Sequence, residues 1–232
     1  MGKRGPKPKK KISTNWSAEL AYAVGLIATD GCLSKDKRHI DFTSKDKELI
    51  KTFQKCLGIE GLKISRKISS HNNKNIYHRT QISNVLFYSW LVSIGMTPNK
   101  SKTLGELKIP DNYFFDFLRG CFDGDGCIYS YWDKRWRSSY MFYIRFISAS
   151  PEFLKWLQKK IEKQSSIKGG VKVATRAWML EFAKTESKKL IKRIYYKEKI
   201  PCLLRKVAKT QRILKIDKEN NARVAELVDA IA

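Results

Sequence analysis

Two aspartates occupy equivalent places in a repeated pattern, each directly before a glycine at the end of an apolar segment. The first copy runs from Gly25 to Cys32 (GLIATDGC), and the second runs from Gly120 to Cys127 (GCFDGDGC). Asp30 and Asp125 stand 95 residues apart, a period that is too long for a solenoid and indicates two duplicated subdomains. Carboxylate oxygens are hard ligands that suit Mg²⁺, and such an ion can activate water for attack on a phosphodiester.

Both apolar segments are predicted to be helices that pack against each other. Small residues recur one turn apart in each of them, at Gly25 and Thr29 and at Gly120 and Gly124, and this spacing lets helix backbones approach closely. If the helices pair about a pseudo-twofold axis, Asp30 and Asp125 meet at adjacent helix ends, where carboxylates are costly unless cations bind. Asp-Gly is also a common helix-ending turn, so the inference depends on its occurring twice.

The charge of the chain indicates a polyanionic partner. Among 232 residues, 47 Lys and Arg face 22 Asp and Glu, which gives a net charge of +25. Such an excess destabilises a compact state unless a polyanion shares its field, and nucleic acid is the commonest one. No apolar run reaches the roughly 18 residues of a membrane-spanning helix. The basic N-terminus lacks the apolar stretch of a signal peptide, so an intracellular protein that is not secreted is expected.

Cysteine and histidine offer no alternative centre. The five cysteines contain no CxxC pair and are odd in number, which favours buried thiols in a reducing compartment over disulfides or zinc. The three histidines are scattered along the chain. They are too few for a histidine-based nuclease or a zinc centre.

Hydrophobic periodicity predicts the same order of elements twice. In the first half we expect helices over 17–29, 47–57 and 84–96, and strands over 32–35, 40–43, 62–68 and 76–83. In the second half we expect helices over 111–124, 151–161 and 186–196, and strands over 141–147, 170–175 and 177–183. The predicted organisation is a basic disordered arm (1–14), an N-terminal subdomain (15–108), a C-terminal subdomain (109–215) and a tail (216–232).

The two repeated segments resemble the motifs of single-chain LAGLIDADG homing endonucleases. The residues that carry the resemblance are 23–31 (AVGLIATDG) and 118–126 (LRGCFDGDG), and it extends over about residues 17–200. It implies an α+β fold of two pseudo-symmetric αββαββα subdomains, each with a curved antiparallel sheet that forms a DNA-binding saddle. The implied activity is a site-specific, metal-dependent double-strand break across the minor groove, made by a monomer on double-stranded DNA.

The resemblance also implies roles for individual residues. Asp30 and Asp125 would hold Mg²⁺, with the backbone carbonyls of Thr29 and Gly124 as further ligands. Mn²⁺ would substitute, and Ca²⁺ would bind without supporting cleavage. Asp123 matches an acidic position of the motif and is interpreted as a helix-end residue behind the site.

A lysine after the second strand of a half often lies beside the active site in this family. Lys45 matches that place and is a candidate to stabilise phosphate charge, although an exposed residue at a helix start would look the same. Ala149 is its counterpart in the second half, which makes the two half-sites chemically unequal.

Alternation along the strands divides residues that cover helices from residues that face DNA. The apolar residues that we expect to face the helices are Ile40, Phe42, Leu62, Ile64, Ile76 and Ile82 in the first half, and Phe142, Ile144 and Phe146 in the second. The residues between them then face away from the helices. The candidate DNA-binding residues are His39, Asp41, Lys63, Ser65, Lys67, Tyr77, Arg79, Gln81, Tyr143, Arg145 and Lys172. A solvated sheet face would give the same pattern. The aromatic and basic insert 129–139 fits either a hairpin that grips the DNA backbone or a tip that packs on the protein.

Several alternatives stay open at this point. On the same fold, the chain could be an RNA maturase that binds its own intron RNA, or a DNA-binding regulator that has lost cleavage. The segment Lys3–Lys9 resembles an AT-hook but also fits a general solubilising arm. The segment 222–232 resembles the translated start of a bacterial leucine tRNA gene, and it also fits an amphipathic helix.

Overall fold

The computed structural model describes residues 11–68, 76–136 and 138–229, and its contacts divide the chain after Gly124 into two compact units. The predicted fold class is confirmed, because the chain is α+β with two four-stranded antiparallel sheets in pseudo-repeated subdomains. The expected arm segment Lys3–Lys9 and the hairpin turn 69–75 lie outside the described residues.

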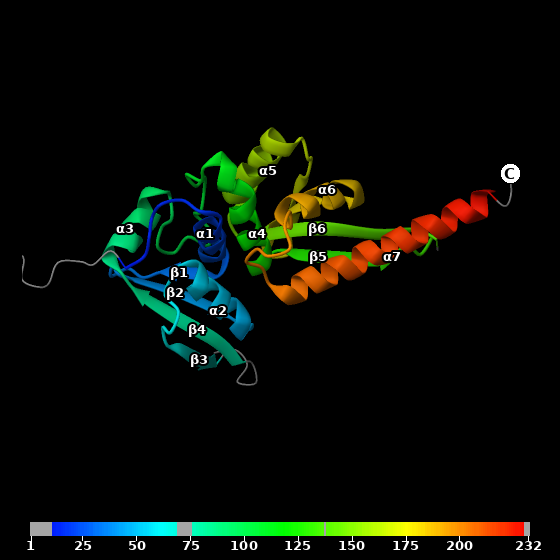
Figure 1. Ribbon diagram of the computed structural model, residues 1–232. Helices are drawn as coiled ribbons and strands as arrows, with labels where there is room; N and C mark the ends of the chain where they lie inside the picture. Colours follow the sequence, from blue (N-terminus) through cyan, green and yellow to red (C-terminus); the bar gives the residue numbers. More distant parts are fainter. Residues whose placement is uncertain (1–10, 69–75, 137, 230–232) are drawn as a thin grey trace, which may run out of the picture. The chain divides into compact units, whose positions relative to one another are not determined.

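The first unit consists of one sheet with its helices, and Figure 1 shows it in blue to green. Its elements are α1 (Ala18–Asp30), β1 (Gly31–Leu33), β2 (His39–Ser44), α2 (Lys47–Cys56), β3 (Ile64–Ile68), β4 (Ile76–Ser83), α3 (Val85–Ser93), a 3₁₀ turn (Asp111–Tyr113) and α4 (Phe114–Gly124). The strands are ordered β1-β2-β4-β3, and every neighbouring pair is antiparallel. We call this sheet A.

Helix α1 begins where the sequence predicts and is buried on all sides. The Ser17 side chain accepts a hydrogen bond from the Leu20 amide at 3.1 Å, which caps the helix. Residues 20–28 are all buried, as expected for a helix that is apolar around its whole circumference. α1 packs against α4, α2 and β2. The helix therefore carries Asp30 to its C-terminal end on a rigid support.

The second unit repeats the sheet and adds a long helix. Its elements are β5 (Cys127–Trp132), β6 (Tyr140–Ser148), α5 (Pro151–Ser165), β7 (Gly170–Ala174), β8 (Ala177–Phe182), α6 (Lys184–Ile194) and α7 (Leu204–Asp229). The strand order is β5-β6-β8-β7, again antiparallel throughout. We call this sheet B. α7 contacts β5 and β6, and Figure 1 shows it in orange to red.

Some expectations differ from the structure at element boundaries. The contacts divide the chain at Gly124 rather than at the predicted boundary 108/109, because α4 packs against α1 of the first unit. The predicted tail 216–232 begins inside α7. Ile12 lies in the predicted arm 1–14 but is only 3% exposed, so its side chain belongs to the core.

Two predicted inward residues of sheet A are exposed instead. Leu62 is 37% exposed and precedes β3, and Ile76 is 52% exposed at the start of β4. They lie at opposite ends of the β3–β4 hairpin, because Ile76 pairs with Ile68 at the turn end and Leu62 precedes the β3 end that pairs with Thr80. The other inward predictions near the centre are confirmed, since Ile40, Phe42 and Ile82 are at most 4% exposed.

Candidate metal and nucleic-acid site

The paired motif helices approach each other at two glycines. A Cβ on Gly25 would lie 2.9 Å from the Gly120 Cα, and a Cβ on Gly120 would lie 3.0 Å from the Gly25 Cα. Contacts this short are backbone against backbone, and no side chain fits between them. The predicted close packing of α1 and α4 is therefore present, and it fixes the ends of the two helices beside each other within the first unit.

Three of the predicted metal ligands meet at these ends. A Cβ on Gly124 would collide with the Thr29 hydroxyl oxygen and would lie 3.1 Å from Asp30 Oδ2. The Thr29 hydroxyl instead donates to carbonyls one turn back, at Leu26 (3.1 Å) and Gly25 (3.2 Å). The missing side chain at Gly124 thus leaves room for the carboxylate of Asp30. Asp125 is the next residue of the chain after Gly124.

The donor set suits a hard cation only if backbone oxygen and water complete it. Within the described residues, no three His, Cys, Asp or Glu side chains gather as a metal-binding group. Carbonyl oxygens in the last turn of a helix lack intrahelical partners, and Mg²⁺ commonly keeps several waters beside one or two carboxylates. One aspartate together with helix-end carbonyl oxygens therefore fits Mg²⁺ better than Zn²⁺.

A buried lysine that the sequence does not single out lies beside this helix end. Lys100 is 6% exposed, and its Nζ donates to the Thr29 carbonyl oxygen at 3.1 Å. Burying an ammonium group costs free energy unless partners compensate for its charge. The position of Lys100 next to the predicted ligand Thr29 therefore indicates a role beside the site. The preceding residue, Asn99, has a φ of 57°, which is the left-handed conformation that Asn tolerates.

The second unit holds a lysine in a related position. Lys206 of α7 is 8% exposed, and its Nζ donates to the Gly126 carbonyl oxygen at 2.6 Å. Gly126 follows Asp125 directly. Each motif aspartate therefore has a buried lysine bound to the carbonyl of a neighbouring residue, on its N-terminal side at Thr29 and on its C-terminal side at Gly126.

Asp123 is buried in the pairing of the motif helices. It is 1% exposed, and its Oδ2 accepts a hydrogen bond from the Tyr22 hydroxyl at 2.8 Å. Burial of Tyr22, together with the negative charge of Asp123, raises the tyrosine pKa well above its usual value. The nearby buried Arg119 donates to Asp116 at 2.8 Å. Asp123 thus stabilises the helix pair.

Lys45 and Ala149 occupy the same turn in the two sheets. In each sheet, a serine at the end of the second strand accepts a hydrogen bond from the backbone amide two residues further on. The Ser44 hydroxyl accepts from the Asp46 amide, and the Ser148 hydroxyl accepts from the Ser150 amide, both at 3.1 Å. Lys45 is exposed, and its Nζ lies 5.4 Å from the centre of the Tyr77 ring. The structure therefore supports the equivalence of the two positions.

Sheet A turns a polar face away from its helices. The register aligns Asp41 with Gln81 and aligns Thr43 and Ser65 with Arg79, so the predicted outward residues of β2, β3 and β4 share one face. They are His39, Asp41, Ser65, Lys67, Tyr77, Arg79 and Gln81. Lys63 is exposed just before β3. Arg79 donates from Nε (2.9 Å) and Nη2 (2.7 Å) to Asp41.

Sheet B places Tyr143, Arg145 and Lys172 on its outward face. The register pairs Arg145 with Glu181 and pairs Tyr143 with Tyr129. Glu181 binds Arg145 Nε through one oxygen and Lys172 Nζ through the other, both at 2.7 Å. Burial would raise the pKa of Glu181, but these hydrogen bonds outweigh it and lower the pKa.

The insert 129–139 forms the end of the hairpin between β5 and β6. The Asn220 side-chain amide of α7 donates to the Ser138 carbonyl at 2.8 Å, and Asp133 accepts from its own loop. Trp136 is nevertheless 70% exposed. The hairpin is thus anchored on the protein while it presents an aromatic side chain outward.

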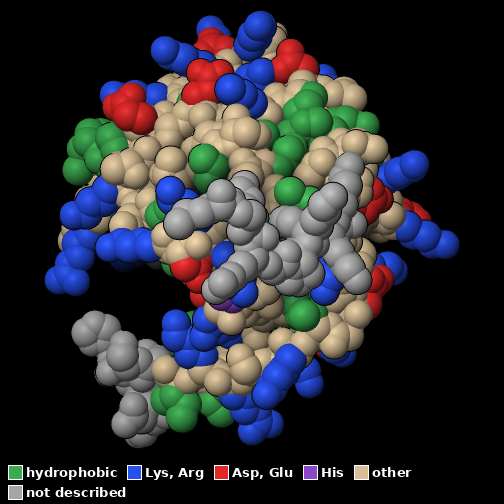
Figure 2. Space-filling view, turned by 90° about the vertical axis from the view of Figure 1, so that its left-hand side faces the viewer, with side chains coloured by type: hydrophobic (Ala, Val, Ile, Leu, Met, Phe, Trp, Pro, Cys, Tyr) green, Lys and Arg blue, Asp and Glu red, His purple; other side chains and the backbone are tan. Residues whose placement is uncertain are grey.

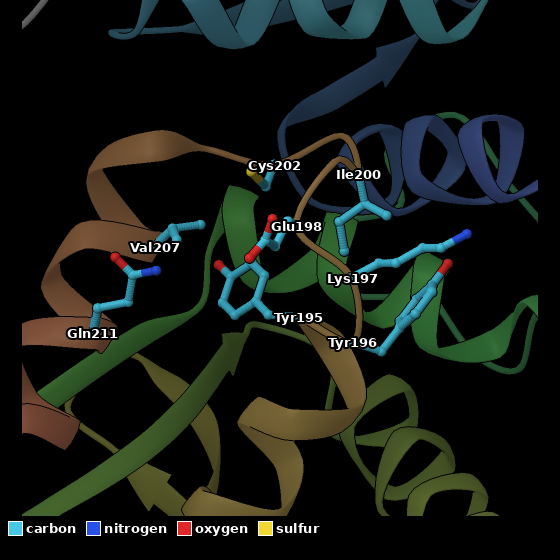
Figure 3. A pocket seen from close by; sticks show the side chains of 8 residues that line it. All are labelled: Tyr195, Tyr196, Lys197, Glu198, Ile200, Cys202, Val207 and Gln211. Carbon is cyan, nitrogen blue, oxygen red and sulfur yellow. The ribbon is translucent and has the colours of Figure 1, made fainter.

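A pocket of about 370 Å³ lies between α6 and the start of α7, and it contains none of the predicted site residues (Figure 3). Its lining is Tyr195, Tyr196, Lys197, Glu198, Ile200, Cys202, Val207 and Gln211. Lys and Arg side chains are spread widely over the face in Figure 2, in keeping with the net charge of +25. In the described part of the chain, no helix has the length and apolarity needed to cross a membrane.

A family model described as a LAGLIDADG-like domain matches residues 17–95. An uncharacterized protein of Methanocaldococcus jannaschii, MJ0314, is 26% identical over 125 residues, which is 53% of this chain and 46% of that protein. The chain thus spans about half the length of this curated relative.

Solved structures extend the likeness to both halves of the chain. The LAGLIDADG meganuclease I-AabMI bound to uncleaved DNA has a TM-score of 0.60 at 15% identity, covering 87% of this chain and 91% of that one. I-DmoI in complex with DNA and Mn has a TM-score of 0.51 at 14% identity, covering 78% and 98%. The N-terminal LAGLIDADG domain of DUF199/WhiA has a TM-score of 0.54 at 17% identity, covering 86% and 89%.

The domain match covers the first motif helix and sheet A, and the structural matches show that the fold continues through the second motif and sheet B. This fold is shared by homing endonucleases and related proteins. Residues 17–95 thus match a LAGLIDADG-like domain, and the chain as a whole has the fold of two pseudo-repeated subdomains seen in LAGLIDADG proteins.

Proposed function

We propose that the chain is a monomeric, site-specific endonuclease that makes double-strand breaks in DNA with Mg²⁺. The observation that carries the proposal is the helix pair in which Gly25 meets Gly120 and the Asp30 carboxylate lies against Gly124. A fold that only bound DNA would not need a carboxylate at each of these two helix ends. The net charge of +25 supports a polyanionic partner.

Asp30 and Asp125 are proposed to hold the cation, with the carbonyls of Thr29 and Gly124 as further ligands. When bound, the cation supplies Lewis-acid activation of water and stabilises the leaving oxygen. The described likeness to I-DmoI in complex with DNA and Mn supports a divalent ion of this class. Ca²⁺ is proposed to permit DNA binding without cleavage.

The buried lysines are proposed to stabilise charge beside the scissile phosphates. Lys100 and Lys206 hold their ammonium groups against backbone carbonyls adjacent to Asp30 and Asp125. In a site with little water, a fixed positive charge lowers the barrier to a transition state that gains negative charge. Lys45 is proposed to add a further cation in one half only.

The outward faces of sheets A and B are proposed to bind the two halves of the DNA target in the major groove. Arg, Lys and Gln on such a face can donate to base edges. In the free protein, the Asp41–Arg79 and Glu181–Arg145 pairs hold two of these donors in place.

The experiment first selects duplexes that the protein binds in Ca²⁺ from a randomised library, and then replaces Ca²⁺ with Mg²⁺. Double-strand cleavage is expected for the parent chain. Asp30→Asn and Asp125→Asn should each abolish it while retaining binding, because groove contacts use other residues. Glu48→Gln, which changes an exposed carboxylate paired with Lys51 on α2, is the control and should cut normally.

A protein that binds selected duplexes tightly but never nicks them in Mg²⁺ or Mn²⁺ would be a regulator on this fold. The likeness to the DUF199/WhiA domain is the reason to test for that outcome. Full-rate cleavage by either aspartate variant would instead show that the site is assigned to the wrong residues.

A further inference from the structure

The outward faces of the two sheets differ in chemistry. On sheet A, the outward side chains of β2, β3 and β4 are polar or charged except for the one aromatic residue, Tyr77. On sheet B, the register brings mainly aromatic and aliphatic side chains to the same face, at Tyr129, Tyr131, Met141, Tyr143, Ile147, Ala174, Ala177 and Met179. The pseudo-symmetry of the backbone is therefore not matched by symmetry of the surface.

This apolar face is accessible. Tyr129 is 46% exposed, Tyr131 is 37% exposed and Ile147 is 41% exposed. Soluble proteins rarely expose contiguous apolar surface unless it contacts a partner. Because Arg145 and Lys172 lie within the same face, the partner must accept positive charge as well as apolar contact.

The tyrosines form an ordered row rather than a loose patch. The rings of Tyr131 and Tyr143 are nearly parallel, at 8° with centroids 6.2 Å apart, and Tyr129 lies 5.6 Å from Tyr131. A side-chain hydrogen bond to Tyr131, together with burial, raises the pKa of Tyr143. Their hydroxyls are engaged with each other, which leaves ring surface as the main contact they offer.

Arg145 is fixed beside two rings of this row, Tyr129 and Tyr143. Its guanidinium carbon lies 5.1 Å from the Tyr129 ring centre and 5.8 Å from that of Tyr143, and Glu181 accepts its Nε proton. An arginine held in this way loses less rotamer entropy when it binds. Its terminal amino groups are not part of the bond to Glu181.

We infer that sheet B recognises a duplex half-site through thymine methyl groups clustered around one guanine. Apolar side chains contact the C5-methyl of thymine in the major groove, and arginine binds O6 and N7 of guanine. Sheet A, with its polar face, reads the other half-site by hydrogen bonds. The inference rests on the proposed DNA-binding role and specifies the class of target that the enzyme takes.

The test removes methyl groups from the DNA and leaves the protein unchanged. A duplex is selected in Ca²⁺ from a randomised library, and thymines in one half at a time are replaced by deoxyuridine at constant salt. In the half under sheet B, each lost methyl should weaken binding about three- to fivefold. The same replacement in the other half should change binding less than twofold.

Protein variants identify which half lies under which sheet. Ile147→Ser removes one exposed aliphatic side chain of sheet B and should reduce the deoxyuridine effect at one thymine position, in one half only. Gln81→Ala on sheet A is the matched control and should leave that effect intact. Arg145→Ala should relax the preference for guanine at one position of the same half.

Three results would overturn the inference: equal binding of thymine and deoxyuridine duplexes, an equal effect in both halves, or tighter binding of single-stranded oligo(dT) than of duplex. The last would assign the tyrosine row to stacking on unpaired bases. Failure of the endonuclease proposal can be distinguished from failure of this inference. In that case the protein does not cleave DNA in Mg²⁺, but deoxyuridine still weakens its binding.

Discussion

Lys100 Nζ donates a hydrogen bond to the Thr29 carbonyl oxygen at 3.1 Å, although the two residues are 71 positions apart in the chain. The contact joins the loop after α3 to the C-terminal end of α1. It places a buried cation next to Asp30 and gives the loop a role that its sequence does not indicate.

The lysine pair leads to the first prediction. Lys100→Met and Lys206→Met keep the length of the buried side chain and remove its charge. Each should slow cleavage of a selected duplex by roughly 10²-fold, because a fixed cation near the developing charge is lost. The apparent affinity for DNA in Ca²⁺ should stay within about twofold of the parent, as expected for an effect on the transition state.

Lys102→Met is the control for this pair, since Lys102 is exposed in the same loop as Lys100. It should cut at the parental rate. A similar loss from Lys102→Met, or a loss of DNA affinity that accounts for the slower cleavage, would remove both buried lysines from the chemistry.

The second prediction concerns the glycine contact between α1 and α4. Gly25→Ala introduces a Cβ that meets the backbone of Phe117, Cys121 and Gly120. Backbone cannot move as a flexible side chain can, so the free energy of unfolding should fall by about 3 kcal/mol. Urea denaturation followed by circular dichroism measures the change.

Gly105→Ala provides the comparison, because a Cβ there meets no atom within 4 Å. Its free energy of unfolding should stay within about 0.5 kcal/mol of the parent. Equal stability of the two variants would show that α1 and α4 do not approach as closely as described.

Many elements could be predicted because local and tertiary preferences agree in them. The helix α1 has a capping serine and an apolar circumference, and β6 alternates buried and partly exposed residues from Tyr140 to Phe146. The repeated Asp-Gly segments indicated the helix pair, and Gly25 and Gly120 meet where their spacing requires.

Helix α7 could not be predicted, because most of the buried positions along it are polar. The buried positions follow a spacing of three and four residues, at Leu203, Lys206, Thr210, Ile213, Asp217 and Asn220. Periodicity of apolar residues misses such a helix. Its buried polar side chains Asp217 and Lys206 bind groups that are distant in sequence, the Lys184 ammonium and the Gly126 carbonyl.

The site lysines were hidden for a different reason. With 47 Lys and Arg in the chain, charge alone cannot select Lys100 and Lys206. Their distinguishing property is burial, and burial depends on the folded arrangement of loops far from the motifs in sequence.

The third prediction concerns the anchoring of α7 on α6. Asp217 is 1% exposed and pairs with Lys184, at 2.5 Å, and with Lys188. Burial alone would raise the pKa of Asp217, but the two ammonium groups outweigh it and hold the pKa below its usual value. Asp217→Asn should lower the free energy of unfolding by about 1–2 kcal/mol at pH 7, since the lysines are partly solvated.

The sign of the pH dependence follows from the lowered pKa. A carboxyl group with a depressed folded pKa stabilises the fold above its unfolded value, roughly pH 4, and loses this contribution as the pH falls through the folded value. The difference between the parent and Asp217→Asn should therefore shrink between pH 5 and pH 2. A constant difference across this range, measured by urea denaturation, would contradict the ion pair.

The fourth prediction follows from the asymmetry between Lys45 and Ala149. The matching hydrogen bonds of Ser44 and Ser148 place both residues at the same point of their sheets. An ammonium near one scissile phosphate lowers the barrier there, and the alanine offers no comparable charge. We therefore expect sequential cutting, with a nicked intermediate that accumulates when Mg²⁺ is limiting.

Lys45→Met should slow one strand by about 10-fold or more and leave the other nearly unchanged, which reduces the difference between their rates. The measurement is a time course on a selected duplex whose strands carry different labels. Lys47→Met is the control, because Lys47 is exposed at the start of α2, two residues further on, and should leave both rates unchanged. Equal rates for the two strands in the parent, or equal slowing of both in Lys45→Met, would mean that the cation at this turn does not act on one phosphate alone.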